Sequence, residues 1–254
     1  MKNSDMKNSD MKNSDMKFSN KTAVVVGGGT GIGHAIARGL AAAGARVIIG
    51  GRREDVLKQA AVGTEIQWHS MDVGNRQEVD AFFAWSLEQL GHIDIMVNAA
   101  GLNVKNRSMK TLLPEQWDHV ININATGAFN CLSAVLPGMR QRRSGSIINI
   151  SSIAGKRAIA LGGVAYSASK FAMTALGTCV SNEVAEDGVR LTNLYPGEVN
   201  TPILDERPTP VTDEHRERIL QPDEVAELVL AILALPPSVH VPEVIIKPLS
   251  QQWY

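Results

Sequence analysis

The chain has 254 residues, of which 44% are hydrophobic and 20% charged, and its formal net charge is −1. This balance excludes a strongly basic nucleic-acid-binding protein and an acidic disordered chain, and the length allows a large core. Two cysteines cannot form a disulfide scaffold or a cysteine-rich zinc site. Because the chain has neither an apolar run of about 18 residues nor a charged-then-apolar leader, we expect a cytosolic protein without a membrane span.

The first 16 residues differ from the rest of the chain. The sequence MKNSD fills residues 1–15 three times over, and a fourth copy begins at Met16. A five-residue period matches neither a helix nor a strand, and methionine is the repeat's only apolar residue, so burial cannot offset the entropy lost on ordering. We expect residues 1–16 to be a disordered tail, with an address or partner-binding tag as the alternative, and residues 17–254 to form one domain.

After the tail, short apolar runs alternate with segments of helical spacing. The predicted strands are 22–26, 46–49, 65–71, 93–97, 146–150, 189–194 and 244–246. The predicted helices are 32–43, 56–61, 75–90 with Asn75 as its N-cap, 114–136, 163–185 and 222–234. Apolar strands that alternate with helices predict an α/β fold, a doubly wound parallel sheet of about seven strands with helices on both faces. Ligands of such sheets bind at the carboxyl ends of the strands.

Glycines fill the loop between the first predicted strand and the first predicted helix. Their spacing is G-x-x-x-G-x-G rather than G-x-G-x-x-G. Glycines let the backbone approach a pyrophosphate closely, and the helix N-terminus offers free N–H groups. We interpret the loop as a dinucleotide-binding site, with a flexible turn that binds nothing as the alternative. Its candidate binding residues are Gly27, Gly29, Thr30, Gly31, Ile32 and Gly33.

The end of the second predicted strand lacks a carboxylate. An acidic residue about 20 residues beyond the glycine loop would bind the ribose 2′-hydroxyl of NAD, but here Gly51 is followed by Arg52 and Arg53. Two guanidinium groups can pair with the 2′-phosphate of NADP. We therefore predict NADP rather than NAD. In the alternative, Glu54 and Asp55 neutralise the arginines, which merely begin a solvated helix.

Tyr166 and Lys170 lie four residues apart on a predicted helix, so their side chains share one face. A neighbouring ammonium is expected to lower the pKa of the phenol from about 10, so that it can exchange a proton with a carbonyl–alcohol pair. Lys170 could also reach the nicotinamide ribose. A Y-x-x-x-K pair alone is more often ordinary helix surface. Here, however, Ser151 and Ser152 end the fifth predicted strand, where a hydroxyl can bind a substrate oxygen.

Three other segments fall at the same predicted edge. Asn98-Ala99-Ala100-Gly101 ends the fourth strand with small residues that permit close approach to a cofactor. Asn124 sits inside a predicted helix, where asparagine is unfavourable, either to hold a structural water or as a tolerated misfit. Pro196-Gly197 ends the sixth strand and is expected to form a wall beside the nicotinamide.

Together, these residues resemble the short-chain dehydrogenase/reductase family over residues 20–247, and the resemblance implies a single-domain Rossmann fold. It implies a catalytic tetrad of Asn124, Ser152, Tyr166 and Lys170, because Ser152 matches the family spacing better than Ser151. The family's glycine and N-N-A-G motifs match with two departures, Val26 and Ala99, each of which removes a bracing hydrogen bond. The further residues that the resemblance places at the cofactor are Asp72, Val73, Asn98, Ala99, Ala100, Gly101, Pro196, Gly197, Val199 and Thr201.

The resemblance implies hydride transfer between NADP(H) and a carbonyl or secondary alcohol, in a homodimer or homotetramer with a small-molecule substrate and no nucleic-acid or membrane partner. The end of the chain, 247–251, resembles the R-P-T-x-Q tail of a branch that acts on small 3-hydroxy acids and varied alcohols. A nucleotide-binding regulator without turnover is the alternative. A metal-dependent alcohol dehydrogenase lacks support, because the six histidines are scattered and no metal site is predicted.

The segment after Pro196-Gly197, residues 198–221, is expected to form a lid over the substrate. It is rich in charged residues, which an apolar steroid pocket would disfavour. Lys156 or Arg157 could pair with a carboxylate on the substrate, or both could be solvated loop residues. We therefore expect a small polar or mixed carbonyl compound, with a 3-hydroxy acid as one candidate.

Overall fold

The computed structural model describes residues 17–252, so the predicted disordered tail, 1–16, lies outside the described residues. Seven strands form one all-parallel sheet in the order β3-β2-β1-β4-β5-β6-β7. The strands are β1 (Thr22–Val26), β2 (Arg46–Gly51), β3 (Gln67–Ser70), β4 (Ile95–Asn98), β5 (Gly145–Ile150), β6 (Val189–Pro196) and β7 (Glu243–Ile246). The predicted doubly wound sheet is confirmed.

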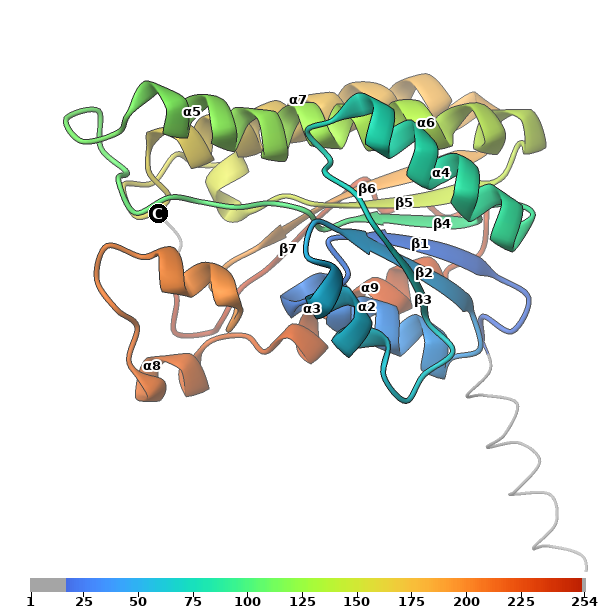
Figure 1. Cartoon of the computed structure of the whole chain (residues 1–254), viewed down its shortest axis with the longest axis horizontal. Helices are drawn as coiled ribbons and strands as arrows, with labels where there is room; N and C mark the ends of the chain where they lie inside the picture. The colour runs from blue at the N-terminus through green and yellow to red at the C-terminus, as the bar shows by residue number, and fades with distance from the viewer. Residues whose placement is uncertain (1–16, 253–254) are drawn as a thin grey trace, which may run out of the picture.

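Helices cover both faces of the sheet (Figure 1). On one face lie α4 (Arg76–Leu90), α5 (Pro114–Ile121), α6 (Gly127–Arg142) and α7 (Val164–Val184). On the other face lie α2 (Gly31–Ala42), α3 (Glu54–Ala61) and α9 (Pro222–Leu233), with the short α8 (Asp213–Arg218) beyond the sheet edge. Asn75 caps α4 as predicted, because its Oδ1 accepts a hydrogen bond from the backbone N of Gln77 at 3.1 Å.

Side chains alternate between the two faces of each strand, and this alternation divides the core in two. Val25 of β1 packs with Ile36 and Leu40 of α2 and with Val229 of α9. On the opposite face, a second cluster includes the buried residues Val24, Phe82, Met96, Leu132 and Met139. Because both faces of the central strands are covered, their apolar runs are continuous.

The predicted helix 114–136 differs from the structure in its end and in its continuity. The run continues to Arg142, and a π-helical turn, η1 (Asn122–Thr126), joins α5 to α6. Asn124 lies within this turn, and its side chain bonds both backbone polar groups of Leu102 in the loop after β4. π-Helical turns inside α-helices occur frequently at functional sites.

The same helical run, Pro114–Arg142, is long and apolar enough to cross a membrane by length and composition. Half of its most apolar window is buried inside the fold, and α6 supplies Leu132 and Met139 to the core. A buried core helix meets the same criterion, so this run is weak evidence for a membrane span.

Candidate active site

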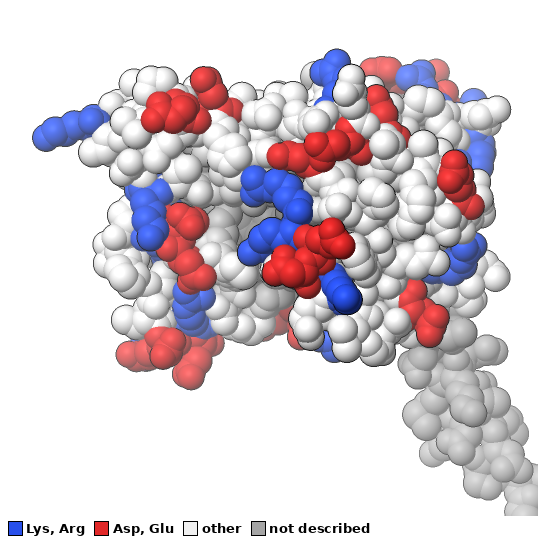
Figure 2. All heavy atoms as spheres, in the orientation of Figure 1, with Lys and Arg blue, Asp and Glu red and all other residues white. Residues whose placement is uncertain are grey.

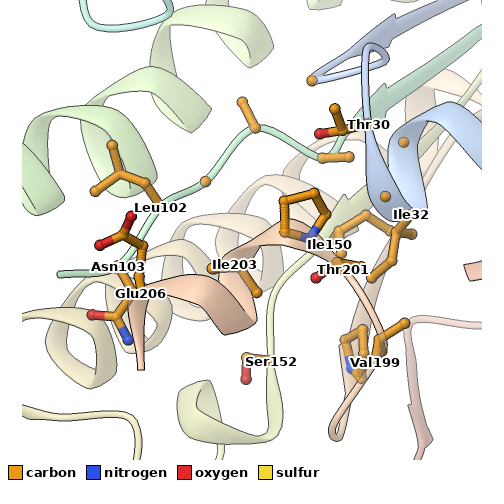
Figure 3. Close-up of a pocket in the computed structure, with 18 of the residues that line it drawn as sticks. Thr30, Ile32, Leu102, Asn103, Ile150, Ser152, Val199, Thr201, Ile203 and Glu206 are labelled. Carbon is orange, nitrogen blue, oxygen red and sulfur yellow. The ribbon is translucent and has the colours of Figure 1, made fainter. Parts of the chain in front are cut away.

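A cavity of about 450 Å³ opens at the carboxyl ends of the strands, where the loops after β1, β2, β4, β5 and β6 converge. The chain order of the strands reverses between β1 and β4, which is where doubly wound sheets bind their ligands. Figure 3 shows Thr30 and Ile32 at one end and Asn103 and Glu206 at the other, with Ser152 and Ile203 between them. On the surface, Lys and Arg side chains gather around a hollow, with carboxylates beside them (Figure 2).

The glycine loop forms a cradle made of backbone. Gly27 has a φ of +77°, and a Cβ added there would lie 2.6 Å from the backbone N of Ala100. At Gly33, an added Cβ would overlap the carbonyl oxygen of Gly27. All six predicted loop residues line the cavity, beside the N-terminus of the 12-residue helix α2. This bare, electropositive cradle fits a pyrophosphate.

Arg52 and Arg53 stand at the end of β2, exposed and lining the same cavity. Within residues 17–252, neither guanidinium forms an ion pair with Glu54 or Asp55 at 4.0 Å or less. The carboxylates of Glu54 and Asp55 lie instead in the first turn of α3, where negative charge interacts favourably with the helix dipole. The arginines are therefore placed where an anionic group in the cavity could pair with them.

The other predicted cofactor residues divide into two groups. Asp72 and Asn98 are not among the lining residues: Asp72 Oδ1 accepts from Gly74 N at 2.8 Å, and Asn98 is buried with an unpartnered Nδ2. Their contacts with a cofactor stay predictions. The predicted residues that line the cavity are Val73, Ala99, Ala100, Gly101, Pro196, Gly197, Val199 and Thr201.

Ser152 and Tyr166 meet in the middle of the cavity. The Ser152 hydroxyl accepts from Ala154 N at 3.1 Å and lies close enough to the Tyr166 phenol to lower the pKa of that phenol. Ser151 is directed away, because its hydroxyl donates to the Lys170 carbonyl at 3.3 Å. Of the two candidate serines, Ser152 is thus the one that pairs with Tyr166.

The pKa of Tyr166 is raised rather than lowered as the sequence analysis expected. Burial of the phenol raises it, and this outweighs the hydrogen bond from Ser152 and the positive charge of Arg107, which both lower it. Lys170 Nζ lies 5.7 Å from the centre of the Tyr166 ring and donates to the Ile150 carbonyl at 2.9 Å. Burial lowers the pKa of Lys170 to about 8. Tyr166 therefore holds its proton at neutral pH.

Asn124 is fully buried and lies behind the cavity rather than on its wall. Its Oδ1 accepts from Leu102 N at 2.8 Å, and its Nδ2 donates to Leu102 O at 2.9 Å and to Ser169 Oγ at 3.0 Å. Both ends of the amide side chain are thus engaged within the protein. Asn124 braces the loop after β4, and its predicted part in holding a water stays a prediction.

Sequence reasoning missed Arg107 at the far end of the cavity, whereas Glu206 and Arg207 belong to the charged lid segment, 198–221, that it expected there. Arg107, Glu206 and Arg207 all line it, and they come from the loop after β4 and from the end of η4 (Pro202–Glu206). Gln251 lines it too and accepts from Glu198 N at 2.9 Å through Oε1. No motif marks Arg107, because its place in the cavity depends on a long-range approach of loops, whereas Gln251 falls in the tail motif, 247–251.

Lys156, one of the two residues considered as partners for a substrate carboxylate, pairs with another side chain of the protein. Lys156 Nζ forms an ion pair with Glu243 and lies 4.8 Å from the centre of the Tyr195 ring, and it does not line the main cavity. Arg157 lines a neighbouring cavity instead. The hypothesis that Lys156 binds a substrate carboxylate is therefore wrong.

Comparisons with known proteins agree with this geometry. The family model described as short chain dehydrogenase matches residues 21–211. An uncharacterized oxidoreductase of Staphylococcus epidermidis is 35% identical over 230 residues, which are 90% of this chain and 97% of that protein. An alcohol dehydrogenase of Thermococcus sibiricus, complexed with 5-hydroxy-NADP, superposes with a TM-score of 0.82 at 32% identity and covers 92% of this chain and 99% of its own. A serine dehydrogenase in complex with NADP+ has a TM-score of 0.83 at 30% identity, with 91% and 96% covered.

Proposed function

The chain belongs to the short-chain dehydrogenase/reductase family of oxidoreductases, and on that basis we propose that it exchanges a hydride between NADP(H) and a carbonyl or secondary alcohol. The observation that carries this proposal is that Ser152, Tyr166 and Lys170 line one cavity together with the glycine cradle. One cavity thus offers an acid–base group beside a cradle for a dinucleotide.

Each residue of the central group has a distinct part in the proposed reaction. Ser152 hydrogen-bonds the substrate oxygen, and Tyr166 gives that oxygen a proton in reduction and takes it back in oxidation. Lys170 holds a positive charge under the phenol and binds the ribose, and Asn124 fixes the loop after β4. A bound nicotinamide supplies the hydride in reduction, so that two electrons and two hydrogens are gained by the carbonyl and the reverse holds for the alcohol.

Protonated Tyr166 suits reduction at neutral pH. Because burial raises the pKa of this phenol, the proton that a carbonyl oxygen must receive is already in place. Oxidation needs the phenolate, which takes the proton back from the alcohol.

We propose NADP rather than NAD as the cofactor. Arg52 and Arg53 supply positive charge at the end of β2, where a carboxylate would otherwise repel the 2′-phosphate. The alcohol dehydrogenase and the serine dehydrogenase described above are complexed with 5-hydroxy-NADP and NADP+, which supports this choice. Of the substrates, we propose small polar or mixed carbonyl compounds, because Arg107, Glu206 and Arg207 line the far end of the cavity beside apolar side chains such as Leu161 and Ile203.

The exposed apolar side chains suggest that the protein associates with itself. Trp117, Phe129 and Phe171 are 37%, 45% and 43% exposed, and they lie on α5, α6 and α7 of one helical layer. A contiguous apolar patch on a helical layer marks an interaction site. We propose a homodimer or homotetramer, and light scattering after size exclusion would measure its mass.

The experiment that tests the function is a panel of small ketones, aldehydes and alcohols assayed with NADPH, NADH and their oxidised forms. We expect turnover of at least one carbonyl compound and a preference for NADPH. Tight binding of NADPH without turnover of any compound in either direction would contradict the proposal and favour a nucleotide-binding regulator.

A further inference from the structure

Arg107 is held rigidly at the far end of the cavity. Its Nε donates to Val104 O at 3.0 Å, its Nη2 donates to Glu206 O at 2.8 Å, and its Nη1 donates to Leu161 O. These three carbonyls belong to three separate loops. A guanidinium has five N–H groups, so two remain beyond the three that these bonds use.

Arg107 also shares its cavity with the reacting centre. It lines the same cavity as Ser152 and Tyr166, and its positive charge acts on the Tyr166 phenol. A ligand that reaches both Tyr166 and Arg107 would therefore carry a polar oxygen at one end and an acceptor for the guanidinium at the other. Guanidinium groups bind carboxylates through two parallel hydrogen bonds.

Arg107 and Arg207 both line this end of the cavity, and their neighbouring charges make Arg107 the better site for an anion. Arg207 Nη2 lies 3.1 Å from Glu198 Oε2, and both side chains are mostly buried, so the charge of Arg207 is already compensated. Arg107 instead bonds only backbone carbonyls within the described residues, although the carboxylate of Glu206 acts on its charge from a distance.

We propose that Arg107 binds a carboxylate of the substrate, which makes small hydroxy acids and the corresponding oxo acids the preferred substrates. The proposal rests on the proposed function, because it assigns one end of the substrate to Arg107 and the reacting oxygen to Tyr166 and Ser152. It replaces Lys156, whose ammonium is paired with Glu243 outside the cavity.

The test compares an acid with its neutral ester in Arg107→Gln. For 3-hydroxybutanoate we expect kcat/KM to fall about 10- to 100-fold, chiefly through KM, because a charge-assisted hydrogen bond is lost. For methyl 3-hydroxybutanoate we expect a change within about threefold. Arg38→Gln, which removes an exposed arginine of α2 outside the cavity lining, is the matched control and should leave both values unchanged.

An equal loss on acid and ester would overturn the proposal, because it would show that Arg107 only ties the loops together. A wild-type enzyme that prefers the ester would overturn it as well. Calorimetric binding of 3-hydroxybutanoate to the NADPH-loaded protein gives a readout that does not depend on turnover, because both partners are reduced and cannot react, and Arg107→Gln should weaken it about tenfold or more. If the panel of carbonyl compounds shows no turnover but this binding difference persists, the proposed function fails while the carboxylate site stands.

A second variant keeps the test decisive if Arg107→Gln does not fold. Glu206→Gln removes the negative charge that competes for Arg107, and the backbone carbonyl that receives Nη2 stays in place. We expect KM for 3-hydroxybutanoate to fall about two- to fivefold, with little change for the ester. A higher KM for the acid would contradict a carboxylate site at Arg107.

Discussion

The two ends of the cavity are built in different ways. The end that contains Thr30 and Ile32 is made of glycines and backbone N–H groups on the ends of buried strands (Figure 3). The end that contains Glu206 is made of side chains, both charged and apolar, and includes the ion pair of Arg207 with Glu198 at 3.1 Å. Backbone geometry suits a constant group such as a dinucleotide, whereas side chains can change to suit a substrate.

The largest expected effect is at Tyr166, where the two ends meet. Tyr166→Phe removes the proton donor but leaves the ring and the glycine cradle in place. We expect kcat to fall by at least about 100-fold on any good substrate, with the dissociation constant for NADPH nearly unchanged. Steady-state rates and fluorescence titration of NADPH would measure the two quantities.

Tyr195→Phe is the matched control for this change. Tyr195 is also buried, but its hydroxyl donates to Glu243 at 2.7 Å outside the main cavity. We expect near-normal kcat, with at most a modest loss of stability. Near-normal activity in Tyr166→Phe would mean that another group supplies the proton.

The next effect concerns the charge at the cofactor end. Replacing both Gly51 and Arg52 by aspartate puts carboxylates where the 2′-phosphate is proposed to bind. We expect the preference for NADPH over NADH to fall by about 10- to 100-fold and to reverse, because each charged hydrogen bond contributes at that scale. Equal dissociation constants for both cofactors in the unmodified protein would refute the assignment of Arg52.

The shape of the glycine cradle is expected to matter at about the tenfold level. Gly33→Ala puts a methyl group against the carbonyl of Gly27, so the loop must shift. We expect the affinity for NADPH to fall by about tenfold or more while the substrate end is unaffected. Gly138→Ala is the control, since a Cβ there meets only the end of Arg142 at 3.5 Å; its affinity should match the wild type, and a loss equal to that of Gly33→Ala would point to a general defect.

The smallest effect is one of stability, at Lys170. Burial lowers the pKa of this lysine to about 8 in the folded protein, whereas the unfolded value is 10.5. Between these pH values the unfolded chain binds the extra proton, so the contribution of Lys170 to stability rises with pH across that window. We therefore expect Lys170→Met to increase the free energy of unfolding by about 1–3 kcal/mol at pH 7.

Urea unfolding at neutral and alkaline pH would measure this effect. The difference in the free energy of unfolding between the variant and the wild type should shrink as the pH rises toward 10.5, the pKa of lysine in the unfolded chain. A variant that is less stable than the wild type at pH 7, or a stability difference that grows with pH, would show that burial of the Lys170 ammonium does not destabilise the fold.

Much of the fold followed from local patterns, because buried parallel strands read as continuous apolar runs. The strand 22–26 and the N-cap Asn75 agree with the structure. The π-helical turn at Asn124 was not predictable, because it accompanies contacts with Leu102, which lies 22 residues away. The short α8 was missed as well, since six charged or polar residues show no apolar period.

The candidate site divides along the same line. The glycine loop, Ser152, Tyr166 and Lys170 were predictable, because sharp turns and short spacings leave signals in the sequence. Arg107 was not, since its guanidinium is placed by carbonyls up to 99 residues away. The expected fall in the pKa of Tyr166 was wrong, because spacing reveals a nearby cation but not the extent of burial.

The most direct test of the account uses NADPH that carries deuterium at the transferred position of its nicotinamide. Transfer of this deuterium to a small carbonyl compound in a single turnover is measured by mass spectrometry of the alcohol. We predict that the wild type transfers the label and that Tyr166→Phe, saturated with the same cofactor, transfers it at least about 100-fold more slowly. A wild type that binds NADPH but labels no carbonyl compound, or a variant that transfers the label at the wild-type rate, would contradict the account.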